Sequence, residues 1–291
     1  MHITVTGSLG NIGKKLVTEL VAAGQEVTVI SSRSERTAAI EALGAKAAIG
    51  SITDADFLIS VFSGSDAVFA MTPPNLGGDN VVSNTTKAGE SFAAAFKAAN
   101  VKKVVMLSSI GADLPNGNGP IEGLHNIEKI YNALEGVDVV FLRAGYFYIN
   151  YYNDVPMVKN AGIIGANFPS TTVLPLVHPE DIAIAAATAL QQPSSGKKIQ
   201  YIISDLRPAA DLATVFGAAT GKTLPWIEFT DEQSLHGMQD AGVPAEIAQL
   251  YTDMGTGLRS GKIQSGFQNS GEAVTGKIKL ETFAEEFAKA F

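Results

Sequence analysis

Three glycines near the start of the chain, Gly7, Gly10 and Gly13, constrain its fold more than any other feature. They follow a short run of strand-forming residues at 2–6 and lead into a helical run at 14–23. A strand, a glycine turn and a helix in this order form the context of a dinucleotide-binding fingerprint. The spacing is G-x-x-G-x-x-G, whereas many dehydrogenases have G-x-G-x-x-G, and a glycine-rich turn without a ligand is the alternative. The position directly after the first strand favours a nucleotide site.

Each glycine has its own predicted role. Gly7 allows a tight turn off the strand, Gly10 lets a pyrophosphate approach the backbone, and Gly13 lets the helix lie close to the sheet. The free N–H groups at the start of the helix then face the phosphates. The residues of this turn that we expect to contact the cofactor are Gly7, Leu9, Gly10, Asn11, Ile12 and Gly13.

The end of the second predicted strand, 26–30, indicates which cofactor is preferred. Folds that bind NAD place an Asp or Glu there, which binds the ribose 2′-hydroxyl. This chain has no acid between Val27 and Ser34, and it carries Ser32 and Arg33 instead. An arginine can donate two N–H bonds to a 2′-phosphate, which a carboxylate would repel. We therefore expect Ser32 and Arg33 to bind NADP(H) in preference to NAD(H). The alternative is that Arg33 is an ordinary solvated charge.

Strands and helices alternate through the first half of the chain. The predicted strands are 2–6, 26–30, 46–49, 67–71, 103–107 and 137–142, and the predicted helices are 14–23, 35–43, 55–62, 81–100 and 121–134. This order predicts an α/β fold, a Rossmann-type doubly wound parallel sheet. The alternation loosens later, so we predict an NADP-binding domain at 1–150 and a smaller C-terminal α+β lobe at 151–291, built onto the sheet edge. The boundary is soft, and some later segments are expected to return to the first domain.

Ligands of open α/β sheets bind at the carboxyl ends of the strands. Three predicted strands end in residues suited to that position. The expected cofactor contacts there are Thr72, Pro73, Ser108, Gly145, Tyr146 and Phe147. Together with Trp226, the rings of Tyr146 and Phe147 are also expected to form apolar walls for a substrate, and Tyr146 is a catalytic candidate.

The predicted helix 121–134 carries two further catalytic candidates, His125 and Lys129, which share one face because they are four residues apart. Short-chain dehydrogenases have a tyrosine four residues before a lysine on the corresponding helix. We expect Lys129 to bind the nicotinamide ribose and to contribute to cofactor binding. His125 could orient the substrate or donate a proton, since imidazole titrates near neutrality. The alternative is a solvated helix face with an ordinary histidine.

Composition excludes several kinds of site. The chain has 21 basic and 29 acidic residues, a net charge of −8, which argues against a nucleic-acid partner and against an anionic membrane surface. It has no cysteine, and its four histidines are scattered away from clustered carboxylates, so no metal site is predicted. The start of the chain does not resemble a signal peptide and no apolar run is long enough to span a membrane, so we expect a cytoplasmic protein.

These residues together resemble the NmrA-like family of atypical short-chain dehydrogenases/reductases, and among them its bacterial NAD(P)H:quinone oxidoreductase members most closely. The resemblance covers nearly the whole chain. Its markers are the glycine turn, Arg33, His125-x-x-Glu128-Lys129, Leu142 to Phe147, Asp181-Ile182-Ala183, Ala241 to Pro244 and Val274 to Lys277. The chain departs from the family pattern at Ser51, where an Asp often meets the adenine, and at His125, where catalytic short-chain dehydrogenases have a tyrosine.

The resemblance implies an NADPH-dependent oxidoreductase that transfers hydride to a small-molecule substrate, a quinone or a similar small carbonyl compound. A quinone needs no dedicated tyrosine acid if solvent or His125 protonates the product. Two alternatives stay open. One is a non-catalytic NADP(H)-binding redox sensor of the NmrA type, and the other is a reductase or isomerase of phenylpropanoid-like compounds that uses Lys129 as its base. A homodimer is also left open.

Overall fold

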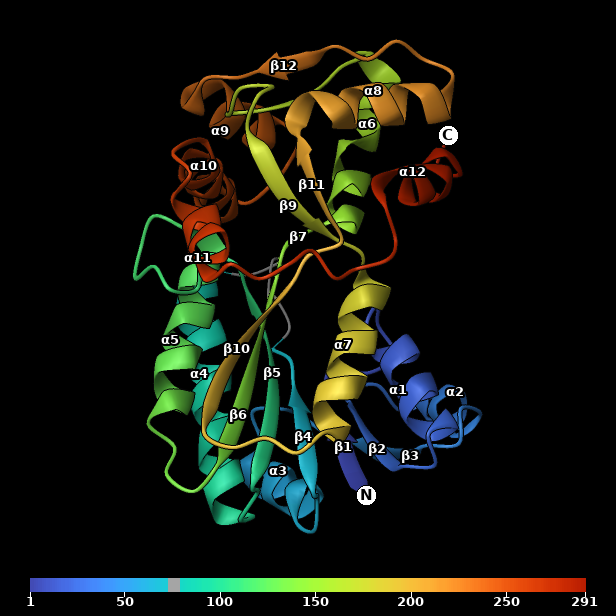
Figure 1. The fold of residues 1–291 in the computed structure, drawn as a ribbon, viewed down its shortest axis with the longest axis vertical. Helices are drawn as coiled ribbons and strands as arrows, with labels where there is room; N and C mark the ends of the chain where they lie inside the picture. The colour runs from blue at the N-terminus through green and yellow to red at the C-terminus, as the bar shows by residue number, and fades with distance from the viewer. Residues whose placement is uncertain (73–78) are drawn as a thin grey trace.

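The computed structural model describes residues 1–72 and 79–291, and its centre is a seven-stranded parallel sheet (Figure 1). The strand order is β10-β6-β5-β4-β1-β2-β3, and each neighbouring pair runs parallel. The strands are β1 (His2–Val5), β2 (Glu26–Ser31), β3 (Lys46–Ile49), β4 (Ala67–Ala70), β5 (Lys103–Ser109), β6 (Asp138–Ala144) and β10 (Lys197–Ile202). The predicted Rossmann-type doubly wound sheet is confirmed.

Helices cover both faces of this sheet, as the right-handed crossovers between parallel strands require. On one face lie α1 (Gly13–Ala22), α2 (Thr37–Glu41) and α7 (Pro179–Gln191), and on the other lie α3 (Ala55–Phe62), α4 (Val81–Ala98) and α5 (Glu122–Asn132) (Figure 1). The strand β4 is buried along its whole length, because it has helices on both sides and reads Ala-Val-Phe-Ala. Short 3-10 turns, η1 (Ser34–Arg36) and η2 (Gly119–Ile121), precede α2 and α5.

The lobe lies at the carboxyl end of the sheet, at the top of Figure 1. It contains a three-stranded sheet in the order β11-β9-β7 and a two-stranded sheet in the order β12-β8. Its strands are β7 (Tyr146–Phe147), β8 (Ile164–Ala166), β9 (Val173–Val177), β11 (Asp205–Pro208) and β12 (Trp226–Glu228). Its helices are η3 (Tyr148–Asp154), α6 (Val155–Asn160), α8 (Ala209–Thr220), α9 (Asp231–Asp240), α10 (Ala245–Arg259), α11 (Lys262–Ser270) and α12 (Leu280–Ala288).

Two segments beyond residue 150 lie with the large sheet. The strand β10 pairs with β6, and α7 packs against α1. A buried carboxylate joins these segments to the C-terminal part of the chain, because Asp181 accepts hydrogen bonds from the Ser204 hydroxyl at 2.6 Å and from the Ile278 amide at 3.0 Å. The division of the chain near residue 150 stays a prediction. Among the described residues, no helix has both the length and the apolar character needed to cross a membrane.

Candidate active site

The carboxyl ends of the central strands face the lobe (Figure 1). A cavity of about 280 Å³ lies between these strand ends and α10. Its wall comes from the end of β5, from the residues that follow β4 and β6, from β7, η2 and η3, from the first turns of α4 and α5, and from α10 and α11. The lining residues are Met71, Thr72, Val81, Thr85, Leu107, Ser108, Ser109, Ile110, Pro120, Ile121, Leu124, Gly145, Tyr146, Phe147, Asn150, Tyr251, Met254, Leu258 and Ile263. Most of these side chains are apolar, which suits a flat organic substrate.

The glycine turn between β1 and α1 has two positions where a side chain cannot fit. Gly7 has a φ of +90°, and a Cβ there would overlap the side chain of Met71. A Cβ at Gly13 would overlap the carbonyl oxygen of Ser8. The turn therefore lies directly against the end of β4, and because Met71 also lines the cavity, turn and cavity adjoin each other.

The third glycine differs from the other two. A Cβ at Gly10 would meet only the carbonyl oxygen of Gly7, at 3.7 Å, so the space in front of it is open. Among the described residues, the amides of Asn11, Ile12 and Gly13 have no hydrogen-bond partner, and the first turn of α1 carries no acidic side chain. An open backbone at the positive end of a helix dipole fits a pyrophosphate. The turn thus fits the phosphates of a dinucleotide.

The end of β2 is tied to this turn by two serines that the sequence analysis did not single out. The Ser8 hydroxyl donates to the Ser31 hydroxyl at 3.1 Å, and the Arg33 amide donates to the same Ser31 oxygen at 3.2 Å. Ser8 also has a φ of +57°, so this turn holds a non-glycine residue in the left-handed region. Ser32 and Arg33 are exposed beside the turn, and within residues 1–72 and 79–291 Arg33 forms no ion pair. Its guanidinium is available to an anion.

A buried ion pair lies beneath the cavity wall. Arg143 on β6 donates to the two carboxylate oxygens of Glu128 on α5, at 3.0 and 2.7 Å, and Ser108 at the end of β5 donates to the same carboxylate at 2.6 Å. The remaining donor nitrogen of Arg143 reaches the Tyr201 hydroxyl at 3.1 Å and Asp113 at 3.4 Å. The Ser108 hydroxyl is therefore engaged within the protein, although Ser108 lines the cavity. Two markers of the sequence, Glu128 and Arg143, are partners of each other, which their separate motifs did not reveal.

The structure does not bring His125 or Lys129 to the cavity. They lie on a different side of α5 from Leu124, which lines the cavity, and from Glu128, which points into the protein. The His125 Nδ1 donates to the Ala112 carbonyl at 2.8 Å, and Lys129 is exposed. Their catalytic roles stay predictions, and the geometry offers no support for them.

Tyr146 lies on the cavity wall as expected, beside Phe147 and Asn150. Burial raises the pKa of Tyr146 well above its ordinary value, and the charge of Asp154 and the nearby Tyr251 add to the rise. The phenol therefore stays protonated and can donate a hydrogen bond to a ligand oxygen. Asn150 and Tyr251 add an amide and a second hydroxyl to the wall, and neither was singled out from the sequence.

The other predicted positions are distributed around this wall. Gly145 and Thr72 line the cavity, and a Cβ at Gly145 would lie 2.6 Å from the carbonyl oxygen of Pro175 on β9. Pro73 lies outside the described residues. Trp226 is not among the lining residues, and its indole donates to the Phe168 carbonyl at 3.1 Å in the lobe. In the described part of the chain, no group of three or more His, Asp or Glu side chains could hold a metal ion.

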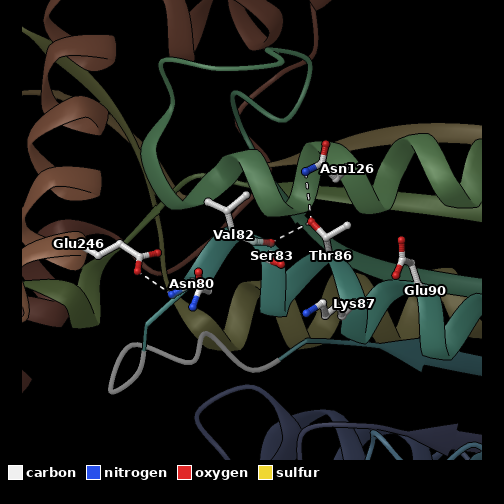
Figure 2. Close-up of a pocket in the computed structure, with 8 residues that line it drawn as sticks. All are labelled: Asn80, Val82, Ser83, Thr86, Lys87, Glu90, Asn126 and Glu246. Carbon is white, nitrogen blue, oxygen red and sulfur yellow. Dashed lines mark hydrogen bonds between the residues drawn. The ribbon is translucent and has the colours of Figure 1, made fainter.

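A second hollow, of about 490 Å³, is open and polar and contains none of the predicted site residues (Figure 2). Figure 2 shows that it lies along α4, with Glu246 of α10 reaching the first turn of that helix. The Glu246 carboxylate accepts from the amides of Asn80 at 2.6 Å and Val81 at 2.8 Å. It therefore caps α4 and holds α10, which forms part of the cavity wall, against the large sheet's helices.

Comparison with known proteins identifies one protein family and two related reductases. The family model described as the NmrA-like family matches residues 1–285. An NAD(P)H azoreductase of Xenophilus azovorans is 26% identical over 291 residues, covering 99% of this chain and 97% of that protein. A phenylcoumaran benzylic ether reductase of Pyrus communis is 24% identical over 272 residues, covering 84% of this chain and 83% of that protein.

Solved structures show the same fold. The NADPH-dependent quinone oxidoreductase of Escherichia coli in complex with NADPH has a TM-score of 0.83 and 18% identity, and the match covers 98% of this chain and 99% of that one. The triphenylmethane reductase of Citrobacter sp. in complex with NADP(H) has a TM-score of 0.78 and 18% identity, covering 99% and 100% of the two chains. The likeness thus includes the lobe as well as the large sheet.

Proposed function

Because this chain belongs to the NmrA-like family, as its sequence predicted, we propose that it is an NAD(P)H-dependent reductase of a small organic molecule. The name of the azoreductase, which matches this chain over nearly its full length, supports a reductase. The glycine turn supports the cofactor, since Gly10 leaves open space before the unpartnered amides of Asn11 to Gly13. A regulator without turnover would bind the same cofactor, so the glycine turn does not separate the two functions, and the reductase name of this relative favours the enzyme.

The proposed acceptor is a quinone or a similar small carbonyl compound. The observation that carries this proposal is the largely apolar cavity, which adjoins the glycine turn through Met71 and is also lined by Tyr146. An apolar cavity with a few hydrogen-bonding groups suits a flat ring with carbonyl oxygens. The cavity lies at the carboxyl ends of the strands, where the ligands of such sheets bind.

The proposed cofactor preference is NADP(H), with Arg33 binding the 2′-phosphate and α1 binding the pyrophosphate. Bound NADPH would supply a hydride, which is two electrons and one proton. A quinone that accepts it needs one further proton to become a hydroquinone. Tyr146 is placed to hold the acceptor oxygen by a hydrogen bond and to stabilise the negative charge that develops there. Burial raises the pKa of Tyr146, so its phenol does not lose its proton permanently. We therefore assign the second proton of the hydroquinone to solvent.

The phenylpropanoid alternative depends on Lys129 as a base beside the nicotinamide. Lys129 is exposed and is not among the lining residues, so its position does not support that reaction. A test is the rate of NADPH consumption with a panel of quinones, for the wild type and for Tyr146→Phe. We expect turnover by the wild type and a loss of about tenfold or more in kcat for the variant, with unchanged NADPH affinity. Lys129→Ala serves as the comparison and should retain its kcat.

An absence of turnover with every quinone, combined with tight NADPH binding, would contradict the reductase proposal and favour the sensor. A loss of kcat in Lys129→Ala as large as that in Tyr146→Phe would restore the catalytic role that the sequence suggested for Lys129. Both readouts use the same assay, so the two outcomes can be separated directly.

A further inference from the structure

The cavity of the proposed function has no charged side chain among its described lining residues. Residues 73–78, which the structure does not describe, read Pro-Pro-Asn-Leu-Gly-Gly and include no charged residue. Besides Ser108, the polar side chains of the wall are neutral hydroxyls and one amide, those of Thr72, Thr85, Ser109, Tyr146, Asn150 and Tyr251. The wall can therefore form hydrogen bonds without offering a counter-charge.

The buried ion pair behind the wall does not supply one either. Two nitrogens of Arg143 are bound by Glu128, and the third lies between Tyr201 and Asp113. The Ser108 hydroxyl, which is the link between this pair and the cavity wall, already donates to Glu128. The charge of Arg143 is thus compensated by carboxylates inside the protein, and it is not free to attract a ligand.

The cations that could serve an anionic ligand lie elsewhere. Arg33 stands beside the glycine turn, where it faces the cofactor in the proposed function, and Lys129 is exposed on α5 away from the lining. The chain as a whole carries a charge of −8, which disfavours the approach of anions to a site with no positive side chain of its own. The described wall of the cavity therefore carries no positive side chain, and Arg33 lies on the cofactor side.

From this distribution we infer that the cavity selects uncharged aromatic acceptors and discriminates against anionic ones such as sulfonated or carboxylated rings. The inference rests on the proposed function and narrows its substrate class. An anion that enters the cavity loses its hydration and finds no opposite charge, which is costly. The carbonyl oxygens of a neutral quinone also lose their hydrogen bonds to water. The hydroxyls of Tyr146 and Tyr251 can replace those hydrogen bonds, so the net cost in free energy is smaller.

The test compares two ligands of nearly equal shape, naphthoquinone sulfonate and naphthoquinone sulfonamide, which differ in one negative charge. Their dissociation constants are measured by calorimetry with the protein saturated with tetrahydro-NADP, whose nicotinamide ring is uncharged and transfers no hydride, so that no turnover is required and the cofactor adds no positive charge to the site. We expect the sulfonate to bind about tenfold more weakly than the sulfonamide, or worse. Equal affinities, tighter binding of the sulfonate, or no binding of either ligand would overturn the inference.

A charge placed on the wall should reverse the preference. Tyr251 and Asn150 are only partly buried, so a lysine at either position can extend into the cavity without displacing the core. Compared with Tyr251→Met, the uncharged control that lacks the same hydroxyl, Tyr251→Lys should strengthen sulfonate binding about tenfold, while the two variants bind the sulfonamide about equally. Asn150→Lys repeats the test from η3 in case the first variant does not fold. If both lysine variants fold and the ratio of the sulfonate and sulfonamide dissociation constants stays at the wild-type value, the inference is contradicted.

Turnover of naphthoquinone sulfonamide, measured in parallel with NADPH, separates this inference from the proposed function. If the sulfonamide binds more tightly than the sulfonate but neither ligand is turned over, the inferred charge selectivity is supported and the reductase proposal is contradicted. Turnover of both ligands with equal binding would retain the reductase and remove the selectivity. Because the neutral sulfonamide withdraws electrons from the ring more strongly than the sulfonate, the selectivity is read from the dissociation constants and not from the relative rates.

Discussion

The two halves of the site are built in different ways. The cofactor half lies within the first 33 residues and uses mainly backbone: three glycines, the amides at the start of α1, and one exposed arginine. The acceptor half is made of side chains from β5, β7, η2, η3, α4, α5, α10 and α11 and from the residues that follow β4, which come together only in the folded chain. The first half depends on local conformation, whereas the second depends on how distant elements are held together.

The two halves also differ in the charge of the side chains that hold them together. The described residues of the cofactor half are joined by neutral hydroxyls, those of Ser8 and Ser31. The acceptor half rests on the Glu128–Arg143 pair and is closed by the bond of Glu246 to the start of α4 (Figure 2). A change in the cofactor half should therefore alter cofactor affinity with little effect on the free energy of unfolding. A change beneath the acceptor half should first lower the free energy of unfolding.

The largest effect is expected for Glu128→Ala, which leaves the buried Arg143 guanidinium without its bidentate partner. Removing one member of a buried ion pair costs about 3–5 kcal/mol in the free energy of unfolding. Urea unfolding of the variant measures this loss, and Glu135→Ala, on the exposed turn after α5, is the control with little expected change. A loss below about 1 kcal/mol would mean that the pair does not hold the acceptor half together.

Gly10→Val tests the cofactor half. Because a Cβ at this position meets no protein atom closer than 3.7 Å, the variant should fold with nearly wild-type stability. The branched side chain should occupy the space of the pyrophosphate and weaken both NADPH and NADH by about 100-fold, or about 2.7 kcal/mol. Calorimetry measures the affinities and circular dichroism checks the fold. Unchanged NADPH affinity in a folded variant would show that the phosphates lie elsewhere.

A smaller and more selective effect is expected for Arg33→Ala. If the guanidinium binds the 2′-phosphate, its loss should weaken NADPH by about 1–3 kcal/mol and leave NADH nearly unchanged. The neighbouring exposed Arg36 provides a matched control, and Arg36→Ala should affect neither cofactor strongly. Equal losses for NADPH and NADH in the calorimetry of Arg33→Ala would refute the 2′-phosphate role.

The smallest expected effect concerns the pH dependence of stability and Asp154, the last residue of η3. Burial raises the pKa of Asp154 from 3.8 to about 7. The folded state then holds a proton that the unfolded state releases, so the contribution of Asp154 to stability is full below about pH 4 and falls as the pH rises through about 7. Asp154→Asn removes this dependence, so its free energy of unfolding relative to wild type should increase between about pH 5 and about pH 8. A difference that is constant with pH would exclude the raised pKa.

The sequence predicts the large sheet well, because its elements depend on local patterns, and the cofactor contacts of the glycine turn stay a prediction. A glycine turn after a strand and alternating strands and helices are visible in consecutive residues, and the predicted fold class is confirmed. In the lobe, the sequence does not predict α11, because most of its nine residues are polar and only two are large and apolar. Burial of Ile263 and Phe267 stabilises it in the folded chain, and no local pattern shows that burial.

The acceptor half shows why site residues are harder to find. Tyr251 lies more than one hundred residues after Tyr146, and both residues line one cavity. His125 and Lys129 share a helix face, and that periodicity is visible in the sequence. The buried face of α5 carries Ile127, Tyr131 and Glu128, and the sequence does not show that Glu128 is buried in a pair with Arg143, a contact between separate elements. Helical spacing therefore groups residues correctly without indicating what the group faces.

The central claim is that cofactor and acceptor meet at the carboxyl ends of β1, β4, β5 and β6. A crystal structure of the protein with NADP⁺ and naphthoquinone tests it most directly. The account predicts the pyrophosphate against Gly10 and the first turn of α1, and the quinone in the cavity with a carbonyl oxygen within hydrogen-bonding distance of the Tyr146 hydroxyl. A quinone bound in the polar hollow along α4, or a nicotinamide ring that faces Lys129 in place of Tyr146, would contradict it.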